Sequence, residues 1–151
     1  MTEKFYYKSP IGILEIELKE NFVVGLRIVE CCEKYSESRG YFKEVKKQLD
    51  EYFAGKRIRF DLNVFQVGTD FQKQVWTELQ KIPYGETKSY QEIAELIGKP
   101  KAQRTVGLAC NKNHILLIIP CHRAISKTGN ISGFEYGVVV KEALLKLENA
   151  I

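Results

Sequence analysis

The spacing of apolar residues changes part-way along the chain, and this change constrains the fold more than any other feature of the sequence. In the first third, apolar residues alternate with charged ones, as in Leu14, Ile16 and Leu18, which is the period of a half-buried strand. Further along, they recur every three or four residues, which is the period of an amphipathic helix. Because strands come first and helices follow, the sequence predicts an α+β fold.

The N-terminal part is predicted to be a small antiparallel sheet with one helix. Phe42, Val45 and Leu49 share one helical face, and Ala54 followed by Gly55 ends that helix. The turns at Ser9–Pro10 and Glu20–Asn21 separate the first strands. The expected strands are residues 5–8, 14–18, 22–29 and a fourth at 58–62, and the expected helix is residues 41–53.

A domain boundary is predicted in the weakly patterned stretch of residues 63–69. It divides the chain into residues 1–65, a structural domain with its linker, and residues 66–151, a mostly helical domain. Thr69 or Asp70 can cap the first helix of the second domain.

Two short helices in the second domain form a candidate helix-turn-helix. Ser89 can cap the first, a Gly-Lys-Pro sequence breaks it, and the second begins at about Lys101. The second helix carries Arg104 near its start and is otherwise rich in small residues such as Gly107, which let a backbone approach DNA closely. The alternative is an ordinary helix pair whose basic residues are merely solvated.

A candidate nucleophile follows the apolar run of residues 115–119. Cys121 comes directly after Pro120, and the neighbouring His122 and Arg123 could favour its thiolate, the reactive form. In an extended segment, however, adjacent side chains point in opposite directions, so His122 needs a turn or a bridging water to reach the thiol. The alternative is an inert buried cysteine.

Glu148 is the candidate third member of this site. It lies one helical turn after Leu144, on an apolar stripe, and near a helix C-terminus where a negative charge is unfavourable. A carboxylate in such a position either lies at a solvated helix end or serves a cationic partner. His122 is the candidate partner, and this second interpretation gives a carboxylate–histidine–thiol relay.

Composition excludes several classes of protein. With 44% hydrophobic and 28% charged residues, the chain is not disordered, and its longest pure apolar run of five residues cannot cross a membrane. The N-terminal residues show no apolar signal segment, so we expect a cytoplasmic protein with reduced cysteines. Only two histidines and no CxxC pair are present, which makes zinc binding a weak hypothesis. A net charge of +4 permits an anionic partner.

Residues 118–123, Ile-Ile-Pro-Cys-His-Arg, resemble the active-site signature of the O6-alkylguanine-DNA alkyltransferases, or methylated-DNA–protein-cysteine methyltransferases. The resemblance covers about residues 71–150, while the N-terminal part is similar only in the order of its elements. It implies an N-terminal domain like ribonuclease H and a C-terminal DNA-binding domain. The matching positions are Tyr84, Gly85, Glu86, Ser89, Tyr90, residues 102–107, Asn113, Gly133, Lys141 and Glu148.

The resemblance also implies the roles of individual residues. Cys121 would take the alkyl group in a single irreversible turnover, with His122 and Glu148 acting on it through a water. Tyr90 would assist rotation of the nucleotide and protonate the leaving base, and Arg104 would fill the vacated stack. The implied DNA-binding set is Ser89, Lys101, Ala102, Gln103, Arg104 and Thr105, and the implied pocket set is Asn113, Pro120, Arg123, Gly133, Phe134 and Glu135.

The implied partner is the minor groove of double-stranded DNA that contains O6-alkylguanine. The expected protein is a monomer without metal or cofactor, associated with the nucleoid if it is prokaryotic. Phe134 stands where the family often has tyrosine, and Leu108 replaces a frequent glycine. Two alternatives remain: a damage-sensing module without transfer activity, which Cys121 disfavours, and a cysteine-dependent hydrolase, which leaves the helix pair unexplained.

Overall fold

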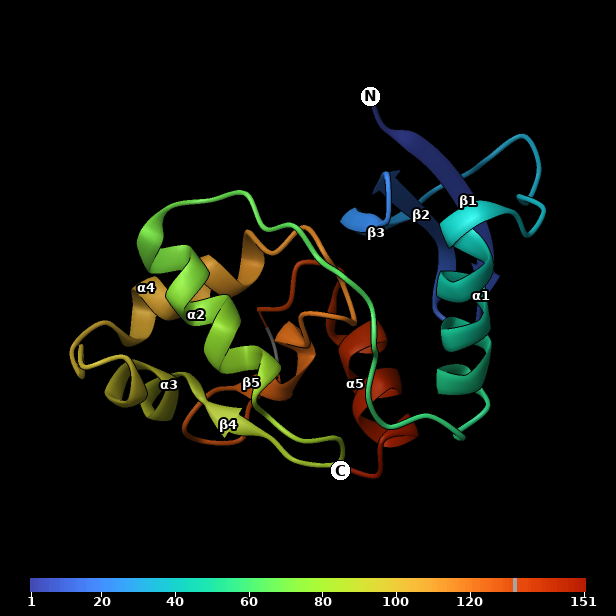
Figure 1. The fold of residues 1–151 in the computed structure, drawn as a ribbon. Coiled ribbons are helices and arrows are strands. Elements are labelled where there is room, and N and C mark those ends of the chain that lie inside the picture. The colour runs from blue at the N-terminus through green and yellow to red at the C-terminus, as the bar shows by residue number, and fades with distance from the viewer. Residues whose placement is uncertain (132) are drawn as a thin grey trace. The chain divides into compact units, whose positions relative to one another are not determined.

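The structure is a computed structural model that describes residues 1–131 and 133–151, and it confirms the α+β class. The chain forms two compact units (Figure 1). One contains Met1–Gln66 with His114–Leu116, and the other contains Val67–Asn113 with Leu117–Ile151. The first unit therefore includes four residues, Gln66 and His114–Leu116, that the division at 65/66 assigns to the C-terminal domain.

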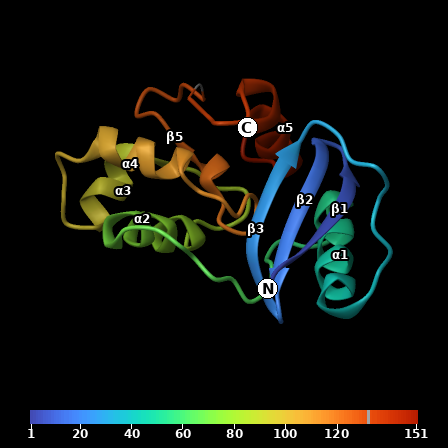
Figure 2. The same cartoon turned by 90° about the horizontal axis from the view of Figure 1, so that it is seen from above.

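The first unit is a three-stranded antiparallel sheet in the order β1 (Glu3–Ser9), β2 (Gly12–Lys19), β3 (Phe22–Val29), with α1 (Gly40–Phe53) along one face (Figure 2). The ring of Phe5 stacks on Phe42 of α1 at 4.5 Å, and the Tyr7 hydroxyl donates a hydrogen bond of 2.6 Å to Asp50. The first three strands and the helix are confirmed. Their bounds are β1 Glu3–Ser9, β2 Gly12–Lys19, β3 Phe22–Val29 and α1 Gly40–Phe53.

The prediction of a fourth strand at residues 58–62 was wrong. This segment forms no strand, and Ile58 is exposed. The backbone N–H of Asp61 donates to the Gln48 side chain at 2.8 Å, and its carbonyl accepts from the same side chain at 3.0 Å. A glutamine of α1 thus satisfies backbone groups that a strand would satisfy through a ladder.

The second unit consists mainly of helices. Thr69, one of the two predicted candidates, caps α2 (Asp70–Gln80), and Ser89 caps α3 (Tyr90–Leu96) as predicted. The structure shows that each cap is a capping box. The Trp76 indole N–H donates to the Ala109 carbonyl at 2.9 Å and so ties α2 to α4. The elements are α2 Asp70–Gln80, β4 Lys88–Ser89, α3 Tyr90–Leu96, α4 Gln103–Asn111, the 3₁₀ turn η1 Cys121–Arg123, β5 Ala124–Ile125 and α5 Val138–Leu147. Strands β4 and β5 pair in parallel.

Candidate active site

Cys121 lies in a turn, not in an extended segment. Residues Cys121–Arg123 form one turn of 3₁₀ helix, in which successive side chains diverge by about 120°. The sequence predicts that His122 needs a turn or a bridging water to reach the thiol, and a turn is present here. The backbone N–H of Arg123 donates to the Pro120 carbonyl at 3.0 Å, which closes the turn. This turn directs His122 and Arg123 toward the same carboxylate.

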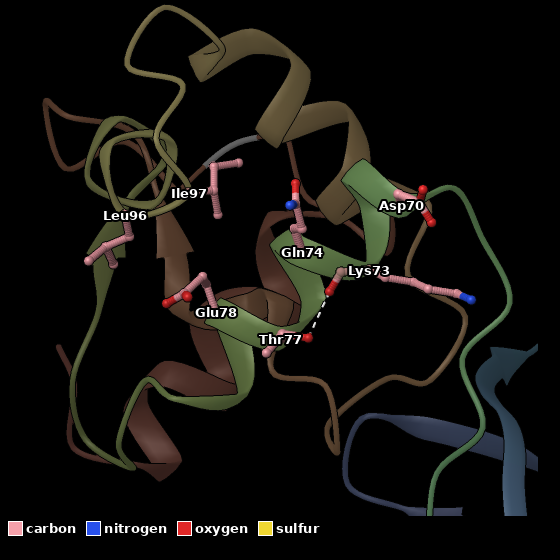
Figure 3. Close-up of a pocket in the computed structure, with 7 residues that line it drawn as sticks. All are labelled: Asp70, Lys73, Gln74, Thr77, Glu78, Leu96 and Ile97. Atoms are coloured by element: carbon pink, nitrogen blue, oxygen red, sulfur yellow. Dashed lines mark hydrogen bonds between the residues drawn. The ribbon is translucent and has the colours of Figure 1, made fainter.

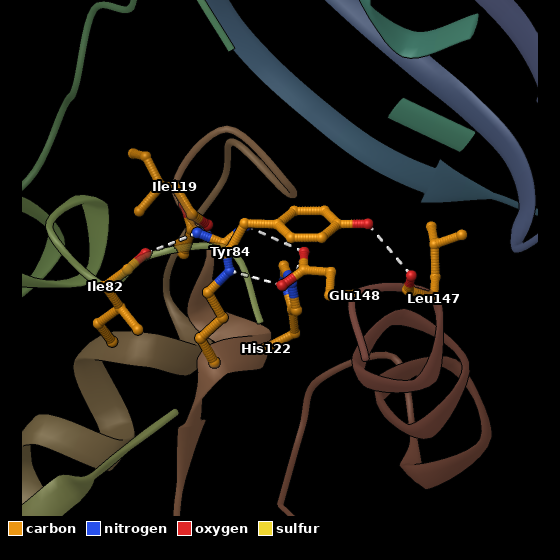
Figure 4. Close-up of polar contacts among 8 residues, drawn as sticks. Ile82, Tyr84, Ile119, His122, Leu147 and Glu148 are labelled. Carbon is orange, nitrogen blue, oxygen red and sulfur yellow. Dashed lines mark hydrogen bonds and ion pairs between the residues drawn. The ribbon is translucent and has the colours of Figure 1, made fainter. Parts of the chain in front are cut away.

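Glu148 lies at the end of α5 and binds two partners (Figure 4). Its Oε2 is 2.8 Å from His122 Nε2. Arg123 binds it with two hydrogen bonds, Nε to Oε1 at 2.8 Å and a terminal nitrogen to Oε2 at 3.0 Å. Arg123 also donates to the Ile82 carbonyl at 2.7 Å. The structure thus brings His122 and Glu148 together, but the cationic partner of the carboxylate is Arg123, which sequence reasoning missed.

The hydrogen bond to Glu148 fixes the tautomer of His122. A carboxylate only accepts, so the imidazole carries its proton on Nε2 and presents the Nδ1 lone pair. Burial lowers the pKa of His122 below its ordinary value of 6.5, which keeps the ring neutral. Among the residues that the structure describes, His122 Nδ1 is the buried side-chain nitrogen or oxygen atom that has no hydrogen-bond partner. This atom is available as a base.

Cys121 is a buried thiol held by Asn113. The Asn113 amide donates to Cys121 Sγ at 3.2 Å and to the Ile119 carbonyl at 2.8 Å. Burial raises the pKa of Cys121 to about 11, although the Asn113 hydrogen bond and the charge of Lys141 act to lower it. Desolvation outweighs these two effects, so the protonated thiol is the favoured form of Cys121 in the resting protein.

Tyr90 begins α3 and lies against a buried lysine. The Lys141 ammonium donates to the Ala124 carbonyl and lies 3.5 Å from the Tyr90 hydroxyl oxygen. It also lies 5.7 Å from the centre of the Phe134 ring. Burial raises the pKa of Tyr90 to about 12, so the phenol keeps its proton at neutral pH. Sequence reasoning included Lys141 only as a matching position, because nothing local indicates that a lysine of α5 is buried.

The remaining candidate residues are more dispersed. Ser89 is buried, and its hydroxyl accepts a hydrogen bond from the backbone N–H of Glu92 as the cap of α3. In the implied DNA-binding set, Ala102 is half-buried at the start of α4, and the exposed members are Lys101, Gln103, Arg104 and Thr105. In the implied pocket set, the buried members outside the cluster are Pro120 and Phe134, and the exposed members are Gly133 and Glu135.

A separate hollow of about 550 Å³ lies between α2 and the end of α3 (Figure 3). None of the candidate residues lines it, and its walls mix both charge signs with Leu96 and Ile97. In residues 1–131 and 133–151, no three His, Cys, Asp or Glu side chains are grouped as metal ligands. None of the described helices has the length and apolar character to span a membrane. All four cysteines are free.

Comparisons with known proteins identify the family. Residues 70–150 match the DNA-binding domain of 6-O-methylguanine DNA methyltransferase, and residues 4–65 match its ribonuclease-like domain. The chain belongs to this family. The match confirms the resemblance and extends it to the N-terminal unit of this methyltransferase, where the sequence supplied only the order of elements.

Several relatives are similar over nearly their whole length. A methylated-DNA–protein-cysteine methyltransferase of Methanosarcina acetivorans is 45% identical, with 95% of this chain and 96% of the relative covered. The crystal structure of a Mycobacterium tuberculosis O6-methylguanine methyltransferase matches with a TM-score of 0.90 at 41% identity, covering 99% of this chain and 94% of that one. A structure of Mycobacterium tuberculosis OGT in complex with DNA matches with a TM-score of 0.86 at 42% identity, covering 96% and 91%.

Proposed function

We propose that this methyltransferase repairs DNA by direct reversal, moving the alkyl group of O6-alkylguanine to Cys121. The observation that carries the proposal is the neutral His122, which follows Cys121 in the same turn. Its Nε2–H donates a hydrogen bond to Glu148, and its Nδ1 has no hydrogen-bond partner. This is the arrangement of a general base for a buried thiol.

In the proposed reaction the thiol loses its proton as it attacks. A water between Cys121 Sγ and His122 Nδ1 carries the proton to the imidazole, and the resulting imidazolium is stabilised by Glu148. Because Arg123 already balances the Glu148 charge, Glu148 does not require a protonated His122 in the resting site. The sulfur–carbon bond forms as the bond between the alkyl carbon and O6 breaks.

The departing guanine takes a proton from Tyr90. Its phenol is protonated at neutral pH, and the nearby Lys141 ammonium stabilises the negative charge that develops on the Tyr90 oxygen. A thioether is a poor leaving group, so the alkyl group stays on Cys121 and each molecule acts once. The displacement requires no metal or cofactor.

The proposed DNA contact is made by α4, in the minor groove of a duplex. Arg104 has an exposed side chain at the start of this helix and would fill the space that the flipped nucleotide leaves. Ser89 would act indirectly, by fixing the start of α3. We propose that the protein works as a monomer in the cytoplasm, at the nucleoid if the cell is prokaryotic.

The decisive experiment is intact mass analysis after incubation with a duplex that carries one O6-methylguanine. We expect the protein to gain one methylene, on Cys121 by peptide mapping, with no more than one equivalent transferred. Cys121→Ala should bind the duplex without gaining mass, and the buried-cysteine control Cys110→Ala should still be methylated. Binding without mass gain in the natural chain would instead indicate a damage-sensing module, and repeated turnover would refute single-use transfer.

A further inference from the structure

Glu135 is an acidic residue of the candidate pocket to which the proposed reaction gives no role. It lies at a corner of a tight turn, which closes because the backbone N–H of Gly137 donates to the Phe134 carbonyl at 3.0 Å. Phe134 anchors this turn in the site, since its side chain is buried and its ring centre lies 5.7 Å from the Lys141 ammonium. Glu135 itself is exposed, and it forms no ion pair with any residue that the structure describes.

The negative charge of Glu135 acts on the reacting sulfur. Burial is the largest cause of the raised pKa of Cys121, and the Glu135 charge adds to it, while the Lys141 ammonium opposes it. Partial burial raises the pKa of Glu135 itself, and the charge of Lys112 opposes that shift. Lys112 directly precedes Asn113, whose amide donates to Cys121 Sγ at 3.2 Å. The anchored turn and these charges together place the carboxylate at the rim of the pocket, beside the thiol.

The charges that act on the sulfur also act on the group that it attacks. In the proposed transfer the alkyl carbon lies about 3–3.5 Å from Cys121 Sγ, so a substituent on that carbon lies among the same charges. Lys141 is completely buried and pairs with no carboxylate of the described residues. Without Glu135, the pocket would therefore carry an uncompensated positive charge and would attract an anionic substituent.

We propose that Glu135 is a specificity-determining residue that offsets Lys141 and selects neutral alkyl groups, such as methyl, over alkyl groups that carry a negative charge. The proposal rests on the proposed function and names the substrate class of the same site. The transfer step is unchanged: the sulfur–carbon bond forms and the carbon–O6 bond breaks. The thiol proton passes to His122, and the departing guanine takes a proton from Tyr90.

Affinity for DNA does not account for a carboxylate at this position. The partner is a polyanion, so a negative charge beside the base pocket weakens binding to every duplex. Specificity does account for it, because a repulsive element that acts only on the wrong substrate rejects that substrate. A negatively charged alkyl group would meet the Glu135 carboxylate, whereas a methyl group would not.

The test uses one duplex sequence with three lesions. These are O6-methylguanine, the anionic O6-carboxymethylguanine and its neutral amide of equal size, O6-carbamoylmethylguanine. Single-turnover rates at saturating DNA give the ratio of carboxymethyl to carbamoylmethyl transfer, which separates charge from size and from DNA affinity. Glu135→Gln should raise this ratio about tenfold or more, because the repulsion in the pocket is removed and the attraction of Lys141 remains. Glu135→Asp, which keeps the charge, should retain a ratio near that of wild type.

Glu142→Gln is the matched control, because it removes the same charge from a glutamate that pairs with Lys146 at 2.7 Å and is 42% exposed. It should keep the wild-type ratio. An unchanged ratio in Glu135→Gln, or an equal rise in Glu142→Gln, would overturn the inference. Rejection of both larger groups by wild type would also overturn it, because size would then decide. If methyl is not transferred to Cys121 either, the proposed function fails as well; if methyl is transferred, only this inference fails.

Discussion

Replacing Arg123 with methionine should destabilise the protein strongly, because it leaves the Glu148 carboxylate buried without its cation. The two hydrogen bonds to Glu148 are 2.8 and 3.0 Å long, and the side chains are only 9% and 0% exposed. Removing one partner of such a buried pair costs about 3–5 kcal/mol. For a chain of this size, that corresponds to a fall in Tm of about 6–20 °C.

Urea and thermal unfolding followed by circular dichroism measure this loss. The matched control is Arg27→Met, which removes a hydrogen bond of similar length, 2.9 Å to Glu15, from an arginine side chain that is 57% exposed. We expect this control to cost about 1 kcal/mol or less, because the Arg27 side chain is largely solvated and Glu15, although only 9% exposed, keeps the Tyr6 hydroxyl as a hydrogen-bond donor. An equal loss in the two variants would refute the argument that burial gives the Arg123 pair its strength.

A double-mutant cycle with Glu148→Gln tests the pairing itself. Each single substitution leaves a buried group without its partner, whereas the double variant removes both charges together. We expect the double variant to be destabilised by clearly less than the sum of the two single losses. Additive losses would show that Arg123 and Glu148 act independently.

Because the charge of Arg123, in addition to burial, lowers the pKa of His122, Arg123→Met should also move the acidic limb of the pH–rate profile to higher pH.

Three further outcomes follow from the site and from α4. Burial lowers the pKa of His122 in the folded state, so the contribution of the neutral imidazole to the free energy of unfolding should be complete above about pH 6.5. Below that pH the contribution should decline, because only the unfolded chain binds the proton. Urea unfolding at a series of pH values measures this decline, and His122→Gln should lack it. Tyr90→Phe should slow single-turnover methyl transfer by about 10²-fold or more, and an unchanged quench-flow rate would exclude Tyr90 as the proton donor. Gly107→Ala should stabilise the protein by about 0.5–1 kcal/mol yet weaken DNA binding, and normal binding would show that no partner approaches this position closely.

The sequence predicts those parts of the fold that depend on neighbouring residues. Thr69 and Ser89 each form a capping box with a residue three positions later, so the start of both helices is encoded within four residues. The three strands are likewise predicted from alternation and turn residues, and the structure confirms them. Membership of the family was predicted from the Pro-Cys-His-Arg signature and its spacing to upstream residues, and the comparisons confirm it.

Interactions between distant residues explain what the sequence did not predict. Arg123 binds Glu148, 25 residues later in the sequence, and the carbonyl of Ile82, 41 residues earlier. Contacts at such separations produce no periodic pattern in the sequence. The wrong strand at residues 58–62 has the same origin, because Gln48 satisfies the backbone of Asp61 from a different element. In each case a side chain from elsewhere overrides the local pattern.

In the proposed mechanism, the thiol becomes reactive only when substrate is present. Burial raises the pKa of Cys121 to about 11 and lowers that of His122, so proton transfer from thiol to imidazole is unfavourable in the free protein. Arg123 adds to this by neutralising Glu148, which otherwise would favour an imidazolium. The transfer becomes favourable only as the sulfur–carbon bond forms and removes the negative charge from sulfur. A protein that is consumed in one reaction benefits from this arrangement, because a permanently ionised thiolate would also react with other electrophiles.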